Sequence, residues 1–383
     1  MALLGPDGKP LQKGAGSLVT DSGEVKKAMQ KLGMPGGVEQ LESGLVVPED
    51  PNKYRIPSDR APSVVSAEEV VRYLVIGHAY NPESMNMFAE KAGRHPCDAI
   101  IIFGVADTKY HIEDMLKILG RTGKLVYAMP GSHELVPDWK ESVEAARRKH
   151  ENIVDMAAHS PFVVSKDHNL LFIPGSFNLT SQSGYYVVTY KGAKTHSRDD
   201  PERGEIRFNS MEEHMGYVTP VTGLKTLVIA HDAPRFNGEE GVDYTPAADV
   251  YSKEGDEIEF SRVTLQRAKF LENMGRKVVY VDENDHQLYG NTGNEDFARE
   301  LRASGIMHLV TAGNSGKSLR SCDREGQKEI PNDQWKSERF LNLGTFAGGN
   351  YATLEVRAAP NLTGKRDVVP GIETRVIEHH VCD

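Results

Sequence analysis

Residues 124–134 have the sequence Lys-Leu-Val-Tyr-Ala-Met-Pro-Gly-Ser-His-Glu, an apolar run that ends in a small polar turn. Apolar runs of this kind are typical of strands that are buried on both faces of a sheet. In open α/β sheets, ligand-binding residues gather in the loops just past the carboxyl ends of such strands. We therefore predict a strand over 124–128, with candidate site residues in the turn that follows it.

The same alternation of apolar runs with helical segments extends from Ser66 onward. The predicted strands are 73–76, 99–103, 124–128, 170–173, 185–190, 226–230, 277–281, 307–311 and 351–356. The predicted helices are 82–92, 112–119, 137–158, 261–274 and 294–303. This order predicts an α/β layered domain over 66–383, with helices outside a buried sheet. The polar, turn-rich segments 196–213 and 235–255 are expected to be insertions in it.

Residues 1–65 differ from the rest, because they are rich in Gly and Pro and show no sustained period of 2 or 3.6. One short helix is expected near 23–32, stopped by Gly33 and Pro35. The remainder is predicted to be an extended arm. Two interpretations stay open: a disordered tail, or an arm held by this protein's own body or by a neighbouring subunit.

Composition favours a soluble globular protein, with 39% hydrophobic and 26% charged residues among 383. No stretch approaches the roughly 18 consecutive apolar residues of a membrane helix, and the first residues do not resemble a secretory signal. Cys97, Cys322 and Cys382 are few and widely spaced, which argues against a disulfide framework and suits a reducing compartment. We therefore expect a cytoplasmic protein. The net charge of -10 lacks the basic footprint of nucleic-acid binding.

Polar or small residues follow five of the predicted strands. They are Gly77-His78-Ala79-Tyr80-Asn81, Gly104-Val105-Ala106-Asp107, Pro130-Gly131-Ser132-His133-Glu134, His231-Asp232-Ala233-Pro234 and Asp282-Glu283-Asn284-Asp285-His286. In order and spacing, these motifs resemble the calcineurin-like metallophosphoesterase superfamily, over roughly residues 70–357. The Gly131–Glu134 segment is the most specific part, and the strand followed by His231 and Pro234 is the second.

The resemblance implies a four-layer sandwich of two mixed β-sheets packed face to face, with helices outside. It also implies a site of seven ligands that hold two metal ions, which bind the phosphate and activate a bridging hydroxide. Matched one at a time, most of those ligands are replaced. The Asp-x-His motif falls on His78 and Tyr80, the Asp that bridges both metals falls on Val105, and the ligand Asn falls on Ser132. His231 is retained. Val105 cannot coordinate a metal ion, because the valine side chain has no lone pair.

The last family motif, Gly-His-x-His, has two placements. At 283–286 it keeps His286 and puts Asn284 at the other histidine position; at 313–316 both histidines are lost. The first is preferred, because Gly-Asn-Ser-Gly at 313–316 resembles a glycine turn that follows this motif in relatives. His133, which in the family contacts phosphate rather than metal, is also retained.

The retained histidines also have a purely structural interpretation, as hydrogen-bonded side chains at strand ends. A rebuilt mononuclear site is a further alternative: Asp107, Asp232 and Asp285 with a histidine form an oxygen and nitrogen donor set that suits Mn, Fe or Zn. No other cofactor is expected.

The resulting functional prediction is a catalytically silent phosphoesterase-like protein, used as a structural or interaction subunit. Its partner would be another protein or a further copy of itself, engaged through the arm of residues 1–65. One alternative is an active metal-dependent phosphatase or phosphodiesterase with an altered ligand set. The other is a module that binds a phosphorylated ligand through His78, His133 and His231 without cleaving it.

Overall fold

The computed structural model describes most of the chain after residue 69, together with two short N-terminal strands. The described residues are 38–40, 46–48, 70–79, 81–105, 109–131, 134, 136–157, 162–165, 168–175, 187–189, 205–207, 223–253, 255, 257–312, 318–344, 346, 349–359 and 371–382. The predicted helix at 23–32 and most of the predicted arm lie outside them. Within 1–65, strands β1 (Val38–Gln40) and β2 (Val46–Pro48) form an antiparallel pair.

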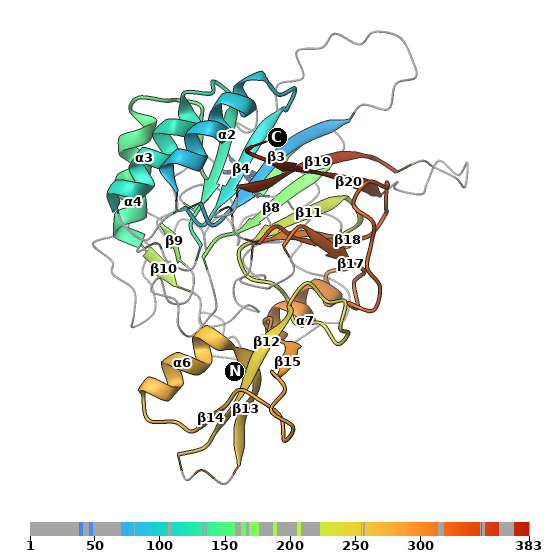
Figure 1. Ribbon diagram of the computed structural model, residues 1–383. Helices are drawn as coiled ribbons and strands as arrows, with labels where there is room; N and C mark the ends of the chain where they lie inside the picture. The colour runs from blue at the N-terminus through green and yellow to red at the C-terminus, as the bar shows by residue number, and fades with distance from the viewer. Residues whose placement is uncertain are drawn as a thin grey trace, which may run out of the picture.

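Two six-stranded mixed sheets form the body of the protein (Figure 1). The first has the order β20 (Ile372–His380), β19 (Asn350–Ala358), β3 (Val71–Gly77), β4 (Ala99–Phe103), β5 (Leu125–Met129) and β6 (Ile153–Asp155). The second has the order β17 (Arg320–Cys322), β18 (Arg339–Asn342), β16 (His308–Thr311), β11 (Thr226–Ala230), β8 (Asn169–Ile173) and β7 (Phe162–Val164). In each sheet four neighbouring strands are parallel, and the flanking strands are antiparallel.

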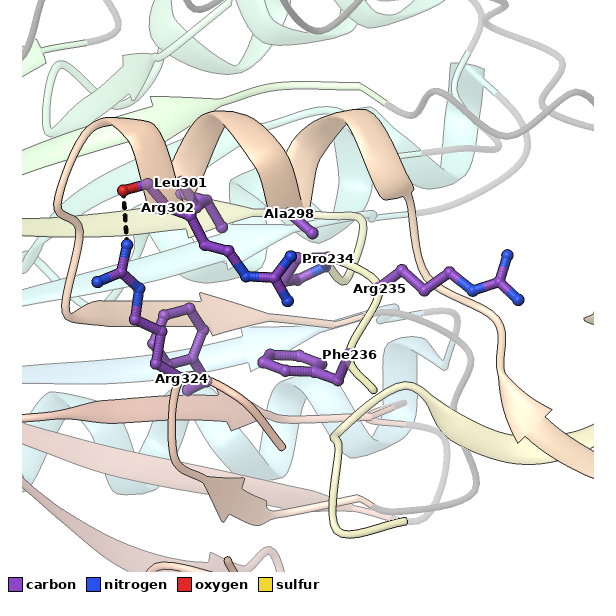
Figure 2. A pocket seen from close by; sticks show the side chains of 8 residues that line it. Pro234, Arg235, Phe236, Ala298, Leu301, Arg302 and Arg324 are labelled. Atoms are coloured by element: carbon purple, nitrogen blue, oxygen red, sulfur yellow. Dashed lines mark hydrogen bonds between the residues drawn. The ribbon is translucent and has the colours of Figure 1, made fainter. Parts of the chain in front are cut away.

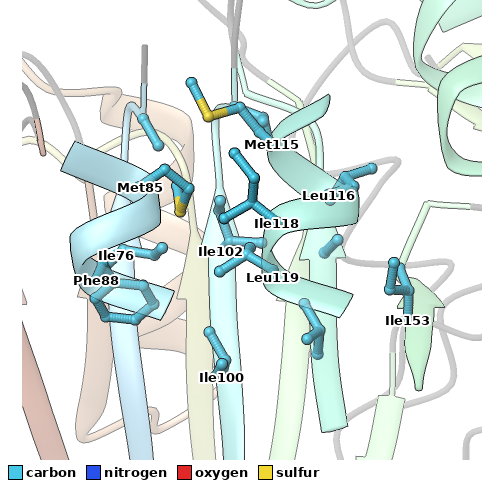
Figure 3. Close-up of a cluster of buried hydrophobic side chains, with 14 of the residues drawn as sticks. Ile76, Met85, Phe88, Ile100, Ile102, Met115, Leu116, Ile118, Leu119 and Ile153 are labelled. Atoms are coloured by element: carbon cyan, nitrogen blue, oxygen red, sulfur yellow. The ribbon is translucent and has the colours of Figure 1, made fainter. Parts of the chain in front are cut away.

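Three hydrophobic cores lie between the layers and hold them together. Helices α2 (Pro82–Arg94), α3 (Lys109–Gly120) and α4 (Val136–Arg147) pack on the first sheet, where Met85 and Phe88 meet Ile76, Ile100 and Ile102 (Figure 3). A second core joins the inner faces of the two sheets. A third lies between the second sheet and α7 (Glu295–Ala303). The predicted four-layer sandwich, helices–sheet–sheet–helix, is therefore confirmed.

Strand β4 shows why the apolar runs are continuous. Each of its five residues is buried: Ile100 and Ile102 face the helices, whereas Ala99, Ile101 and Phe103 face the second sheet. Every position of this strand is covered on one side or the other, and every one of its side chains is apolar. Full burial of one such side chain stabilises the fold by about 1.5–3 kcal/mol.

A small third sheet with one helix projects from the sandwich (Figure 1). It consists of β12 (Tyr244–Tyr251), β13 (Ile258–Thr264), β14 (Val278–Val279), β15 (Tyr289–Asn291) and α6 (Leu265–Asn273). The segment 235–255, predicted as a polar insertion, contributes a regular strand to this sheet, and its Ala248 and Val250 are buried against α6 and β13. One prediction is corrected here. The helix predicted at 261–274 begins only at Leu265, since the preceding residues pair with β12.

Most other predicted elements match observed ones to within a few residues. The helix predicted over 137–158 ends at Arg147. The chain then enters β6, whose first residue Ile153 is buried and pairs with β5. Strands β9 (Val187–Thr189) and β10 (Glu205–Arg207) form a separate pair, so the predicted insertion 196–213 also contributes a strand. A short 3-10 turn, η2 (Gly223–Lys225), precedes β11. No helix within the described ranges has the length and hydropathy to cross a membrane.

Candidate functional site

The loops after β3, β4, β5, β11 and β16 meet at one edge of the sandwich. Gly77, at the end of β3, lies against Ala312, just after β16: a Cβ on this glycine would come within 2.3 Å of the Ala312 Cβ. The peptide N–H of His78 donates to the carbonyl of Phe103, at the end of β4, over 3.1 Å. The candidate site is therefore at the carboxyl ends of the parallel strands, where the sequence predicted it.

Two buried histidines are in direct contact at this edge. The ring centroids of His78 and His231 are 4.5 Å apart with planes at 70°, an edge-to-face arrangement. His78 is 1% exposed and His231 is 3% exposed. The Nδ1 of His231 lies 3.1 Å from a carboxylate oxygen of Asp232, and the Thr311 hydroxyl donates to the His231 carbonyl over 2.8 Å. His231 is thus held at both its ring and its backbone.

Two glycines make room for the His231 ring. A Cβ on Gly131 would lie 2.3 Å from Cδ2 of His231 and 2.9 Å from the Cα of Gly104. Gly104 has a φ of +73°, a backbone conformation that L-residues with a side chain rarely adopt. The rings of His78 and His231 therefore pack onto bare backbone of the loops after β4 and β5.

Glu134 connects the same two loops. Its two carboxylate oxygens accept the peptide N–H groups of Val105 and Gly131, the latter over 2.8 Å. The side chain is 1% exposed, and a buried carboxylate needs such donors. In the sequence Glu134 is only the last residue of the Gly131–Glu134 motif, and its role between the two loops was not predicted. The spacing Gly-x-x-Glu could have suggested it, because a carboxylate three residues on can return to a free N–H, as in a capping box.

Val105 occupies the position that the resemblance assigns to the bridging carboxylate. Its side chain is 0% exposed and belongs to the apolar core beneath α2 and α3. Its backbone N–H is engaged by Glu134. This position offers no side-chain donor to a cation.

Asn284 and His286 lie elsewhere, in a tight turn between β14 and β15 of the projecting sheet (Figure 1). The Asp282 carboxylate accepts the peptide N–H groups of Asn284 and His286 over 2.8 and 3.0 Å, and these bonds lower the pKa of Asp282, with the His286 bond contributing most. The His286 side chain is 78% exposed. The structure therefore does not bring the preferred final motif to the site edge.

The remaining predicted site positions lie outside the described residues: Tyr80, Asp107, Ser132, His133 and 313–316. Among the residues that are described, no three His, Cys, Asp or Glu side chains are grouped as a metal ion requires. Of the five family ligand positions that the structure describes, His78 and His231 contact each other, and Val105 is apolar. These residues do not fit a two-metal centre.

No protein-family model matches the chain, and no curated protein matches it. Among solved structures, TT1561 of Thermus thermophilus is similar at 10% identity and a TM-score of 0.44, with 82% of this chain and 100% of that chain covered. A second solved structure is similar at 10% identity and a TM-score of 0.43, with the same coverage. Likenesses this weak carry no argument. The sheets and cores of this chain alone define it as an α/β sandwich protein.

Proposed function

We propose that this protein is a non-hydrolytic phosphoesterase-like sandwich that serves as a structural or interaction subunit. The observation that carries the proposal is the burial of Val105 in an apolar core, at the position where a phosphoesterase needs its bridging carboxylate. A two-metal site loses the ligand shared by both ions when this position is apolar, and with it the means to activate a bridging hydroxide.

The neighbouring polar groups support the same proposal. The carboxylate of Glu134 is engaged by two backbone N–H groups, and the His78 and His231 rings contact one another. These contacts stabilise the loops at the edge of the sandwich. They give His231 a structural role, which explains why a histidine is present there without a metal ion.

An interaction role is supported by the projecting sheet. Eight large hydrophobic side chains are exposed in the described part of the chain, and five of them belong to this sheet, to α6 or to the turns beside them. These five are Ile258, Leu265, Met274, Val281 and Tyr289. A contiguous exposed apolar patch marks an interaction site, and we propose that these side chains contribute to one. We propose that the partner is another protein or a further copy of this chain, and that the arm of residues 1–65 makes a second contact with it. The free cysteines suit a reducing compartment, and we propose the cytoplasm.

The decisive experiment combines metal analysis of the purified protein with a phosphodiester assay in manganese. We expect less than one tightly held metal ion per chain and no turnover above the buffer rate. The control is His231→Ala, measured beside the unmodified protein. Stoichiometric metal together with turnover that His231→Ala abolishes would refute the proposal and establish the active alternative.

A further inference from the structure

Two chain segments join the projecting sheet to the sandwich (Figure 1). Residues 233–243 lead from the end of β11 into β12, and residues 291–294 lead from β15 into α7. We call these two segments the neck. They are bonded to each other, because the peptide N–H of Arg235 donates to the Asn294 carbonyl over 3.0 Å and the N–H of Asn294 donates to the Ala233 carbonyl over 2.9 Å.

The sandwich end of the neck is fixed by apolar packing. The rings of Phe236 and Phe340 meet edge to face with centroids 5.6 Å apart, and Pro234 and Phe236 lie beside α7 (Figure 2). The projecting sheet has a small core of its own, whose four buried side chains belong to none of the three sandwich cores. Polar bonds in the neck are therefore important for holding this sheet to the sandwich.

The Asp243 carboxylate lies where the two segments of the neck meet. One of its oxygens accepts the side-chain N–H of Asn291 over 2.8 Å. The other accepts the peptide N–H groups of Gly293 and Phe236 over 2.9 and 3.2 Å. The Asp243 carbonyl also accepts the peptide N–H and the hydroxyl of Thr292, each over 3.2 Å. One residue thus bonds the entering segment, the leaving segment and the sandwich end of the neck.

This carboxylate is buried without a neutralising charge. It is 1% exposed, and burial raises the pKa of Asp243 from the ordinary 3.8 to about 6. The bonds from Asn291, Gly293 and Phe236 act in the opposite direction, and no neighbouring charge contributes to the pKa. A buried charge that has only uncharged donors is costly, because these donors replace its hydration incompletely.

The charged side chains around the neck are engaged elsewhere. The pairs on the neck and on the elements beside it are Arg235 with Glu295, Glu240 with Arg320, Arg262 with Asp249, His231 with Asp232 and Arg302 with Glu325. Three more charged residues remain: Glu239 is exposed, Arg324 donates to the Arg302 carbonyl, and Asp323 accepts the peptide N–H of Gln327.

We propose that the neck is a hinge about which the projecting sheet moves as a unit, and that proton uptake by Asp243 holds the hinge closed. Opening the neck exposes the carboxylate to water, where its charged form is stable. The closed neck therefore binds the proton more tightly than the open neck does. By linkage, acid favours the closed form and neutral pH favours the open form.

The size of the effect follows from the two pKa values. The pKa of Asp243 is about 6 in the closed neck, and we expect the ordinary 3.8 in the open one. The contribution of the proton to the closed form is complete below about pH 4 and is lost as the pH rises to about 6. Between pH 5 and pH 7 the ratio of open to closed necks should rise about tenfold. The hinge does not depend on the proposed function.

The test is hydrogen exchange of the full chain, followed by mass spectrometry at pH 5 and pH 7, with each rate divided by the intrinsic rate at that pH. Peptides that contain the amides of Phe236 and Gly293 should be about tenfold less protected at pH 7. Peptides from β4 in the sandwich should lose no protection over this range. Asp243→Asn removes the titrating group, so its neck should be equally protected at both pH values. Glu283→Gln is the matched control, because Glu283 is an exposed carboxylate of the projecting sheet, and it should behave as the unmodified chain does.

Equal protection of the neck at the two pH values in the unmodified chain overturns the inference. A loss of protection that Asp243→Asn retains overturns it too. So does a neck that is as strongly protected as β4, because the sheet then separates only when the whole protein unfolds. If Asp243→Asn does not fold, Asn291→Ala replaces it: loss of this donor raises the pKa of Asp243 further, so the loss of protection should occur at higher pH, and an unmoved midpoint contradicts the hinge. Metal content and turnover, which test the proposed function, do not enter these outcomes.

Discussion

Replacing Glu134 by glutamine changes one oxygen of the carboxylate into an NH₂ group. In the structure both oxygens accept backbone N–H groups, from Val105 and from Gly131. Glutamine can accept only one of them, and its NH₂ then faces the other donor. Hydrogen bonds to a charged group contribute about 1.5–3 kcal/mol, and a buried donor left without an acceptor costs about 1–3 kcal/mol. We therefore expect Glu134→Gln to lower the free energy of unfolding by about 2–4 kcal/mol.

The measurement is urea unfolding followed by circular dichroism, with Glu144→Gln on α4 as the matched control. Glu144 is exposed, and a surface change of this kind shifts stability by no more than about 0.5 kcal/mol. Hydrogen exchange gives the local readout: the amides of Val105 and Gly131 should exchange faster in Glu134→Gln alone. If Glu134→Gln matches Glu144→Gln in stability and in exchange at these two amides, the carboxylate does not connect the two loops and the reasoning is refuted.

Three further predictions follow from buried groups. Val105→Asp places a carboxylate in the apolar core and should lower the free energy of unfolding in urea by about 3 kcal/mol or more. If manganese restores the lost stability, a metal centre can form at this position. Burial lowers the pKa of His168 to about 3 and that of His308 to about 4. Between pH 6 and 5 the unfolded chain therefore takes up protons that the folded chain does not. Urea unfolding across this range should show that each histidine lowers the free energy of unfolding by up to about 1.4 kcal/mol per pH unit. Burial raises the pKa of Asp243 to about 6, so the folded chain takes up a proton there between pH 6 and 5 and gains stability. Asp243→Asn removes this gain and should increase the loss of stability over that range by about 1 kcal/mol. An unchanged dependence on pH contradicts the raised pKa.

The site could be predicted only in part. His78, Val105 and His231 follow apolar runs, and the rule that parallel strands end at one edge was enough to bring them together. Asn284 and His286, the preferred placement of the last motif, lie in the projecting sheet instead. Their segment also follows an apolar run, Val278 to Val281, but that run pairs with β12 in the projecting sheet rather than with β11. Local pattern does not state which sheet a strand joins.

The sequence by itself determined the layers, because strands covered on both faces are mostly apolar, and Ala99–Phe103 is apolar throughout. It also determined that a valine, Val105, follows the strand 99–103. Only the tertiary structure decided which side chains meet at the edge of the sandwich. The contact of His78 with His231 and the attachment of Glu134 to two loops both join segments that are far apart in the chain. Such contacts depend on where the sheets place each loop, and no local period in the sequence carries that information.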